Sequence, residues 1–392
     1  MFPAVLPAAE RPHPEKLEPQ LVTRVVTTIA EIREDAWDAL FPAATEKYAF
    51  YKTVEESGFT DFVFRYVLVY DGEVLAGAAP CFLMNYSLDT TVQGFLKTWT
   101  NALRKIFPSA LCLRVLVCGL PMGRGQVGAR GDDPRVTRLA CAAVEALARD
   151  EKASLVAYKD FDAEDTARFD FLRDEGFYRF ENFPSMAMDL PFASFDAYTK
   201  TLSRASKEGL RRKLKNPNQN EIRLEVSASA DHCLEELYAL YLQTIRRHDE
   251  LGFETVPKDF FRNISKNMPG ETLFFLWWIG PRLAGFAYCL VSGHYFQDYY
   301  LGFDYALSHD YNLFFIRFRD LFNWCLAHGM TTYDIGNTNY ESKRRLGFDF
   351  VRLFTYAKCR NRWINPVFHG LCHLLKPENF DPVFKIMRAR AS

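Results

Sequence analysis

The stretch 280-GPRLAGFAYC-289 decides the fold, because its pattern occurs a second time in the chain as 71-DGEVLAGAAP-80. Both copies combine a turn, the residues Leu-Ala-Gly and an apolar run, which is typical of a strand that leaves a tight hairpin. The copies are roughly 210 residues apart, and an internal repeat indicates an architecture built from copies of one structural unit. We therefore expect two similar units in this chain.

Around the later copy, the pattern predicts a meander of strands followed by a helix. Residues 273–305 predict three consecutive strands, and the last is rich in the aromatic residues that strands favour. Residues 312–329 have helical periodicity and end on His-Gly, a favourable helix stop. Short strands at 331–336 and 352–360 complete this unit.

The same order surrounds the earlier copy. Residues 62–84 predict two strands joined by an Asp-Gly turn, and residues 112–119 predict a third strand. A helix with proline near its first turn follows at 133–152. Residues 154–190 predict a strand, a helix and a closing strand. Strand, turn, strand, strand, helix and strand therefore occur twice in the same order.

These patterns divide the chain into four parts. We expect a loose N-terminal tail at 1–20, a first unit at 21–190, a second and catalytic unit at 191–360, and an amphipathic C-terminal tail at 361–392. The predicted fold class is α/β, of the α+β kind, with two tandem units that are each a mixed sheet flanked by helices. The first unit also carries an amphipathic helical insertion.

Composition limits the class of protein. The 392 residues are 48% hydrophobic and 25% charged, which is enough apolar material for a large core. A net charge of −1 gives no general preference for nucleic acid, and no DNA partner is expected. The nine cysteines form no C-x-x-C pair, which favours buried thiols in a reducing compartment. No metal-site spacing stands out, so no metal is expected.

No stretch predicts export or insertion into a membrane. The N-terminus lacks the basic and apolar regions of a signal peptide, and no run reaches the ~18 apolar residues of a spanning helix. We therefore expect a cytoplasmic protein. The insertion at 91–108 places Trp and Phe on one helical face and basic residues on the other. This pattern fits contact with the inner face of the membrane, or an ordinary surface helix packed on the core.

A polar loop and a basic helix in the second unit carry a resemblance to a known family. Residues 333–350, YDIGNTNYESKRRLGFDF, look like a Tyr-Asp-hydrophobic-Gly strand tip followed by a polar loop, a Phe-Lys pair and a Phe-Gly pair. With the basic stretch 202–216, LSRASKEGLRRKLKN, and the repeated strand order, they resemble the GNAT superfamily of acyltransferases in its tandem, Fem or FemAB-like form. The resemblance covers residues 20–360 and implies two GNAT-like units.

The chain departs from the family pattern in several places. The Phe-Lys pair is Ser-Lys at 342–343, and the Phe-Gly pair is inverted at 347–348. The glycine-rich phosphate loop of simple acetyltransferases is only approximated at 122–131, and the equivalent loop at 306–312 has no glycine. The donor therefore stays open between acyl-CoA, an acyl carrier protein thioester and an aminoacyl-tRNA.

The resemblance implies direct attack of an amine on a thioester or an ester. This chemistry needs a base, a backbone N–H for the oxyanion and an acid for the leaving group. The family fold places these groups around the third strand, the start of the following helix and the next strand tip. The candidate catalytic residues are His309, Asp304, Asp334, His248 and Tyr340.

Each candidate has a chemical reason and a plainer alternative. His309 titrates near working pH and Tyr340 could protonate a leaving group, but a solvated loop and core packing explain them too. His248 lies in a His-Asp-Glu run after a helix, which fits a place above the acceptor or a polar helix end. Asp304 ends the third strand, where an acid can also cap the next helix. Asp334 ends a buried strand and needs a donor, either a substrate amine or an internal group.

Two basic groups fit the phosphates of an anionic donor. The donor-binding candidates are Arg204, Lys207, Arg211, Asn312, Lys343 and Arg344. Arg204, Lys207 and Arg211 share one helical face, which suits phosphates of CoA, a carrier arm, tRNA or lipid, or is simply solvated. Lys343 falls where the Fem-type motif has its lysine, so the resemblance implies contact with the donor.

Three functions are consistent with these observations. The first is an N-acyltransferase that moves an acyl group from acyl-CoA or an acyl carrier protein to a long-chain lipid amine such as a sphingoid base. Bacterial ceramide synthases, which resemble this superfamily, fit that reading, and the 35 phenylalanines and amphipathic segments favour a lipidic acceptor. The second is a Fem-type, aminoacyl-tRNA-dependent transferase of peptidoglycan synthesis, the one reading with a tRNA partner. The third is a non-catalytic, degenerate GNAT binding protein.

Overall fold

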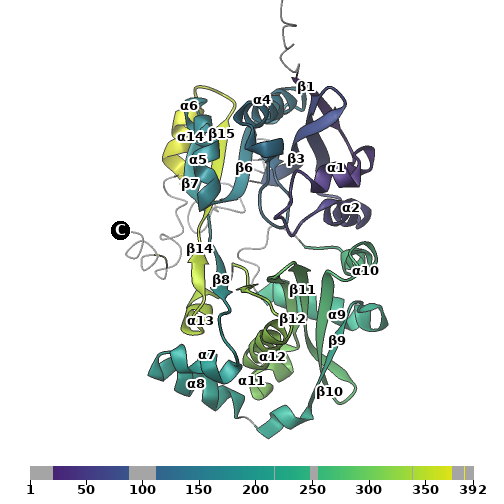
Figure 1. Cartoon of the computed structure of the whole chain (residues 1–392), viewed down its shortest axis with the longest axis vertical. Coiled ribbons are helices and arrows are strands. Elements are labelled where there is room, and N and C mark those ends of the chain that lie inside the picture. The colour runs from purple at the N-terminus through teal and green to yellow at the C-terminus, as the bar shows by residue number, and fades with distance from the viewer. Residues whose placement is uncertain are drawn as a thin grey trace, which may run out of the picture.

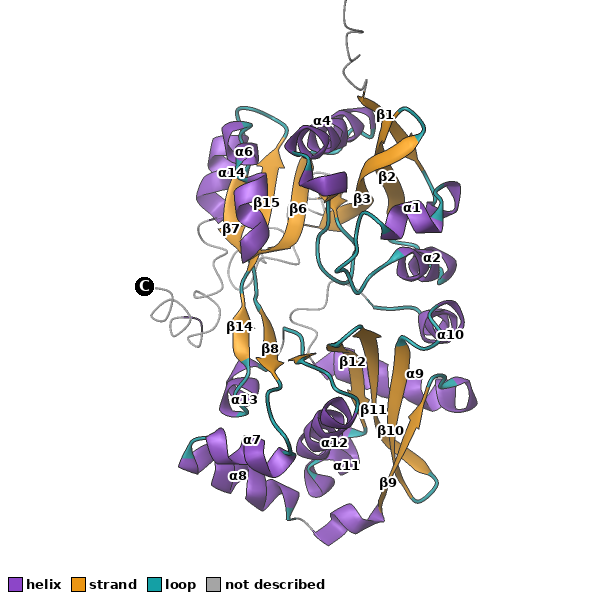
Figure 2. Ribbon diagram, viewed as in Figure 1, coloured by secondary structure: helices purple, strands orange, loops and turns teal. Residues whose placement is uncertain are grey.

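The computed structural model describes residues 21–87, 112–215, 217–247, 255–337, 339–372 and Phe384. These residues form two mixed β-sheets, each flanked by helices (Figures 1 and 2). The first sheet has the order β1-β2-β3-β4-β6-β15-β7, with β5 beside β3. The second has the order β14-β8-β13-β12-β11-β10-β9. The predicted fold class is confirmed, while the insertion at 91–108 lies outside the described residues.

The bounds of the strands follow the expected apolar runs. The first sheet contains β1 (Leu21–Val26), β2 (Val63–Asp71), β3 (Val74–Ser87), β4 (Cys112–Cys118), β5 (Gly128–Ala129), β6 (Leu155–Asp162), β7 (Tyr178–Glu181) and β15 (Leu353–Cys359). The second contains β8 (Ser185–Asp189), β9 (Ile222–Ser227), β10 (Thr272–Ile279), β11 (Arg282–Ser292), β12 (Tyr295–Phe303), β13 (Thr332–Asp334) and β14 (Asp349–Val351).

The helices cover the faces of the two sheets. Those of the first half are α1 (Glu34–Asp38), α2 (Tyr48–Glu56), α4 (Pro134–Asp150), α5 (Thr166–Phe169) and α6 (Phe171–Asp174). Those that follow are α7 (Phe195–Thr201), α8 (Arg204–Leu214), α9 (Leu234–Arg247), α10 (Lys258–Asn267), α11 (Tyr305–Tyr311), α12 (Leu313–Ala327), α13 (Tyr340–Arg345) and α14 (Asn365–Cys372). Among the described residues, none of these helices has the length and apolarity needed to cross a membrane.

The repeated strand order is confirmed. In the first half it runs β2, β3, β4, α4 and β6, and in the second half β10, β11, β12, α12 and β13. Local chemistry explains the boundaries: Asp133 caps α4 by accepting a hydrogen bond from the Arg135 backbone N–H, and Pro134 occupies the first helical position. Each hairpin turns on a glycine with positive φ, Gly72 in the first and Gly280 in the second.

The two sheets exchange strands, which the sequence pattern did not reveal. The predicted closing strand at 178–190 is two strands: β7 belongs to the first sheet and β8 to the second. The break contains Pro184, which has no N–H to continue a ladder of hydrogen bonds. In return, β15 inserts between β6 and β7 of the first sheet. The division at residue 190 stays a prediction, but the chain crosses between the sheets before it.

The two halves also share one hydrophobic core. It joins Trp37, Phe50 and Tyr51 of the first half to Phe260 and Tyr288 of the second. The rings of Phe50 and Phe260 have centroids 5.9 Å apart and meet edge to face. Hydrophobic contact of this kind holds the halves face to face, so side chains from both can build one site.

Candidate functional site

The candidate site lies where two parallel strands of the second sheet separate. β12 pairs with β13 over three residue positions, the last of which places Gln297 opposite Asp334. Shortly afterwards β12 has a β-bulge at Tyr299, which interrupts its register with β11. Within the described residues, no strand pairs with this edge of β12 beyond Gln297. An edge of this kind presents backbone N–H and C=O groups to an extended ligand.

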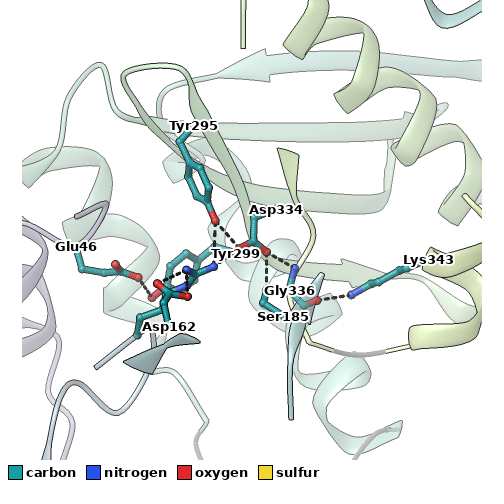
Figure 3. A network of polar contacts seen from close by, with 9 residues as sticks. Glu46, Asp162, Ser185, Tyr295, Tyr299, Asp334, Gly336 and Lys343 are labelled. Atoms are coloured by element: carbon teal, nitrogen blue, oxygen red, sulfur yellow. Dashed lines mark hydrogen bonds and ion pairs between the residues drawn. The ribbon is translucent and has the colours of Figure 1, made fainter. Parts of the chain in front are cut away.

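Asp334, at the end of β13, is the centre of a polar network (Figure 3). Its side chain is 1% exposed. Its Oδ1 accepts hydrogen bonds from the Ser185 hydroxyl (2.7 Å) and the Gly336 N–H (2.8 Å). Its Oδ2 accepts from the Tyr295 hydroxyl (2.5 Å) and from Arg124 Nη2 (3.1 Å). Because a carboxylate has about four acceptor positions, these donors use its full capacity.

Arg124 connects this network to the first sheet. Its Nη1 binds both carboxylate oxygens of Asp162 on β6, at 2.6 and 2.7 Å, while its Nη2 reaches Asp334. Arg124 comes from 122–131, the segment that approximated a phosphate loop in the sequence. In the structure this arginine holds two carboxylates, one from each sheet, at the junction of the two halves.

Glu46 lies at the same junction, in the loop between α1 and α2 (Figure 3). It is 3% exposed and accepts a hydrogen bond from the Tyr299 hydroxyl at 3.1 Å. Burial raises the pKa of its carboxyl group, and the positive charge of Arg124 opposes that shift. A Cβ on Gly123 would come within 2.5 Å of Glu46 Oε1, and Gly123 has a φ of +85°, a backbone conformation that favours glycine.

Lys343 is buried beneath the loop that follows β13. Its Nζ donates hydrogen bonds to the Ile335 carbonyl (2.7 Å) and the Gly336 carbonyl (3.3 Å). Burial, and then the positive charge of Arg317, lower the pKa of Lys343 to about 7, although the Asp334 carboxylate opposes the shift. Both the charged and the neutral forms of this lysine are therefore populated near neutral pH.

A second buried pair supports the bulged strand from the other face. Asp298 of β12 pairs with Arg317 of α12, and both side chains are at most 1% exposed. The Tyr333 hydroxyl donates to the same carboxylate at 3.2 Å. Burying charges without full pairing is costly, so this pair fixes β12 and α12 relative to each other only while both partners are present.

Two sequence-predicted catalytic residues lie outside the Asp334 network. His309 is exposed on the short helix α11. Asp304 caps that helix by accepting from the Ala306 N–H at 3.0 Å, and it forms an ion pair with Arg282. The capping alternative for Asp304 is thus realised.

The other candidates, Tyr340, Asn312 and His248, lie in different parts of the chain. Tyr340 is buried, and its hydroxyl donates to the Pro184 carbonyl at 3.0 Å, close to the strand crossing. Asn312 has a left-handed backbone (φ 53°) between α11 and α12. His248 lies outside the described residues. A catalytic role for any of them stays a prediction.

The basic helix lies away from the network. Figure 1 shows α8 at the end of the molecule opposite the first sheet, beside α7. Arg204 is exposed and pairs with Glu208 on the same helix at 2.9 Å, and Arg211 is also exposed. Arg344, on α13, pairs with Glu341 at 3.3 Å. Donor binding by Lys207 and these arginines stays a prediction.

The sequence reading missed several members of the site. Glu46, Arg124, Ser185, Tyr295 and Tyr299 come from four separate segments, and only the folded chain brings them together. Two signals pointed toward them. Glu46 is an isolated acid near the apolar run 48–51, and Tyr295 and Tyr299 belong to the aromatic strand that was expected beside the site.

Residues 204–344 match the family model described as Acetyltransferase (GNAT) domain. This segment is therefore similar to GNAT acetyltransferase domains. It contains β12, α12, β13 and all of α13 except its last residue, so the separating strands lie inside it. The match to an acetyltransferase family favours the enzymatic readings over a non-catalytic binding protein.

Solved structures and curated relatives extend the comparison beyond the GNAT domain. FemX is 13% identical with a TM-score of 0.58, covering 86% of this chain and 98% of FemX. The C-terminal domain of a protein named lysylphosphatidylglycerol synthetase, from Agrobacterium fabrum, is 11% identical with a TM-score of 0.50, covering 90% and 99%. At such identities the likeness concerns the fold.

The curated relatives are proteins named 8-amino-7-oxononanoate synthase 2 from two strains of Mycobacterium tuberculosis. Each is 23% identical over 348 residues, which is 87% of this chain and 44% of the relative. The chain therefore spans less than half the length of the curated relatives it matches.

Proposed function

We propose that the protein forms an amide by transferring an acyl group from a thioester to an amine at the separation of β12 and β13. The observation that carries this proposal is the bulged edge of β12 beside a buried network of carboxylates, inside a GNAT domain. The donor is acyl-CoA or an acyl carrier protein thioester. No metal takes part in the proposed reaction.

The thioester lies along the β12 edge, with its carbonyl carbon near the bulge at Tyr299. Backbone N–H groups of that edge stabilise the negative charge that develops on the carbonyl oxygen. The amine nitrogen attacks the carbonyl carbon, so that a C–N bond forms and the C–S bond breaks. The thiolate takes up a proton, and the products are an amide, a thiol and one released proton.

Several of the sequence-predicted residues have places in this proposal. Asp334 positions the loop and the strand around the reaction centre, because its acceptor positions are occupied by protein donors. Lys343 lies under the same loop. It acts on the acyl donor through the Ile335 and Gly336 carbonyls, to which its Nζ donates hydrogen bonds. Arg204, Lys207 and Arg211 bind phosphates of the donor from α8.

The acceptor is a long-chain lipid amine, and the specific proposal is a sphingoid base, which would give a ceramide. The Phe-rich composition and the amphipathic insertion at 91–108 support a lipidic substrate taken from the inner face of the membrane. The fold shared with a domain of a protein named for lysylphosphatidylglycerol adds modest support.

The second candidate is a Fem-type transfer from aminoacyl-tRNA in cell-wall peptidoglycan synthesis. The fold similarity to FemX, over 98% of that chain, favours it. The net charge of −1 argues against it, because proteins that bind tRNA usually carry a broad basic surface.

One experiment separates these functions. The purified full chain is incubated with acyl-CoAs of different length and either sphinganine or a short amine, and amide and free thiol are measured together. Equal amounts of N-acyl amide and thiol, with a preference for sphinganine, are the expected result. Consumption of aminoacyl-tRNA in place of acyl-CoA would favour the Fem-type candidate. Absence of turnover with either donor would overturn both.

A further inference from the structure

The proposed reaction needs a group that removes a proton from the acceptor ammonium, and Asp334 is poorly suited to that role. All four of its acceptor positions are occupied, and one of the donors is the charged guanidinium of Arg124. Asp162 is held on both oxygens by Arg124. Asp334, engaged in this way, has no lone pair directed at a new proton, and Asp162 is already paired with a cation.

Glu46 differs from both. Among the described residues, the side-chain hydrogen bond that it accepts comes from a neutral phenol, Tyr299. Its environment is apolar on the side of Phe50, whose ring packs against that of Tyr299 with centroids 5.6 Å apart. The carboxylate is thus nearly buried, bonded to that phenol and to the backbone of Glu46 itself, and held next to the bulge at which the donor carbonyl is proposed to lie.

Three segments of the chain meet at the Glu46 carboxylate. The α1–α2 loop supplies Glu46, β12 supplies Tyr299, and the loop after β4 approaches with Gly123. Any side chain at 123 would collide with Glu46 Oε1 and, at 2.9 Å, with the Tyr299 hydroxyl. The positive φ of Gly123 (+85°) favours glycine at this position, which lies close to both side chains.

We propose that Glu46 is the proton acceptor of the transfer reaction, a catalytic residue that the first half of the chain contributes to the GNAT domain. This inference rests on the proposed N-acyl transfer. The acceptor ammonium gives one proton to the Glu46 carboxylate, and the freed nitrogen attacks the thioester. The thiolate takes the second proton that leaves the nitrogen, and Glu46 then returns its proton to water.

The electrostatic surroundings favour this role. Because burial raises the pKa of Glu46, its carboxylate is a stronger base than an exposed glutamate and lies closer to the working pH. The titratable and charged groups that face it are Tyr51, Arg124, Tyr288, Tyr295, Tyr299 and Asp334. Arg124 supplies the positive charge among them and opposes the rise in the pKa of Glu46.

The test compares Glu46→Gln with Glu55→Gln, a matched neutralisation on α2. Glu55 is partly buried and bonded to Tyr66, Thr28 and the Ile29 N–H, away from the network. Amide formation from acyl-CoA and an alkylamine is followed across pH, with folding checked by thermal unfolding. We expect Glu46→Gln to lower kcat/KM by about 100-fold or more and to abolish the acidic limb of its pH profile. Glu55→Gln should leave kcat/KM and the acidic limb of the pH profile unchanged.

A second acceptor distinguishes a base from a structural support. An alkylaniline of similar length is unprotonated at neutral pH and needs no proton acceptor before attack. With this amine, Glu46→Gln should lose much less activity than with the alkylamine. An equal loss with both amines, or an unchanged pH profile, would overturn the inference, whereas an inactive wild-type chain would instead refute the proposed function.

Another variant covers the case in which Glu46→Gln does not fold. Tyr299→Phe removes the hydroxyl that donates to Glu46 and leaves the ring packing in place. The carboxylate then loses a hydrogen bond that stabilises its charge, so the acidic limb of the pH profile should move to higher pH. A limb that does not move would count against Glu46 as the titrating group.

Discussion

The two halves of the molecule differ at the point where two parallel strands of each sheet separate. In the first, β4 and β6 pair in parallel from Val115 to Cys118 and then separate, and the chain's own loop occupies the gap. The Gly125 N–H donates to the Asp160 carbonyl at 3.4 Å, and Lys159 Nζ binds two carbonyls of that loop at 3.1 and 2.9 Å. In the second, β12 and β13 separate after Asp334.

This second gap is bordered by side chains. Among the described residues, no backbone hydrogen bond joins 298–303 to the loop that follows β13. Polar side chains from both halves gather there (Figure 3). A repeated strand order therefore does not repeat a site. The first half closes its gap and contributes Arg124, and in our proposal Glu46, to the gap of the second half.

The largest expected effect comes from replacing Arg124, which connects the two gaps. Arg124→Met leaves the buried carboxylate of Asp334 without its cation and Asp162 without both of its bonds. Because breaking one side of a buried ion pair strands the other charge, we expect the free energy of unfolding to fall by about 3–5 kcal/mol. Denaturant unfolding measures this.

Arg130→Met is the matched control for Arg124→Met. Arg130 is exposed and follows β5, a few residues along the same connection. Its replacement should change the free energy of unfolding by less than about 0.5 kcal/mol. If the two variants behaved alike, the Arg124 network would not connect the halves energetically.

The next effect tests how tightly each gap is filled. In Gly125→Ala, the new Cβ would lie 1.7 Å from the Lys159 carbonyl oxygen, so the loop must leave β6, at a cost of about 3 kcal/mol. In Gly336→Ala, the nearest atom is 3.9 Å away and the positive φ of 75° alone costs about 1 kcal/mol.

Unfolding of these two alanine variants in parallel gives the comparison directly. A larger loss for Gly125→Ala is the expected result, because a backbone atom cannot move aside as a side chain can. Equal losses would mean that the first gap is no more closed than the second.

The sequence contained the order of these elements but not their partners. Alternating apolar runs, Asp-Gly and Gly-Pro turns and a proline at a helix start are local signals, so the strands and helices of both repeats could be predicted. Which sheet receives β8 or β15 depends on contacts between distant residues, and no local pattern encodes it. The same limit explains why Asp334 was recognised at a strand tip, while Glu46 and Arg124 were not.

A third effect contrasts Lys159 and Lys343, the lysines beside the two gaps. Lys159 has the Asp160 carboxylate 3.3 Å away, whereas Lys343 feels the positive charge of Arg317. Because the folded pKa of Lys343 is about 7, below its unfolded value, the unfolded chain binds more protons above pH 7. Stability should therefore rise with pH from about 7 toward 10, by up to about 1.4 kcal/mol per pH unit.

The contribution of Lys343 appears as a difference from Lys343→Met, which removes the titrating group. Buried tyrosines and thiols with raised pKa act in the opposite direction at alkaline pH, and the difference cancels them. Lys266→Met, at an exposed position on α10, should leave the pH dependence of unfolding unchanged. A difference between wild type and Lys343→Met that does not vary with pH would refute the lowered pKa.

The smallest expected effect concerns the basic helix α8. If the first gap is closed, the phosphates of the donor must be bound from the second half, where Lys207 and Arg211 lie on α8. Replacing both by glutamine should raise KM for acyl-CoA by about 3–10-fold, since exposed charge contacts contribute roughly 1 kcal/mol together. The same pair of changes should leave KM for an acyl-pantetheine, which has no nucleotide phosphates, unaltered. Arg173→Gln, exposed on α6 of the first half, is the control, and an equal rise in KM for both donors would place the phosphates elsewhere.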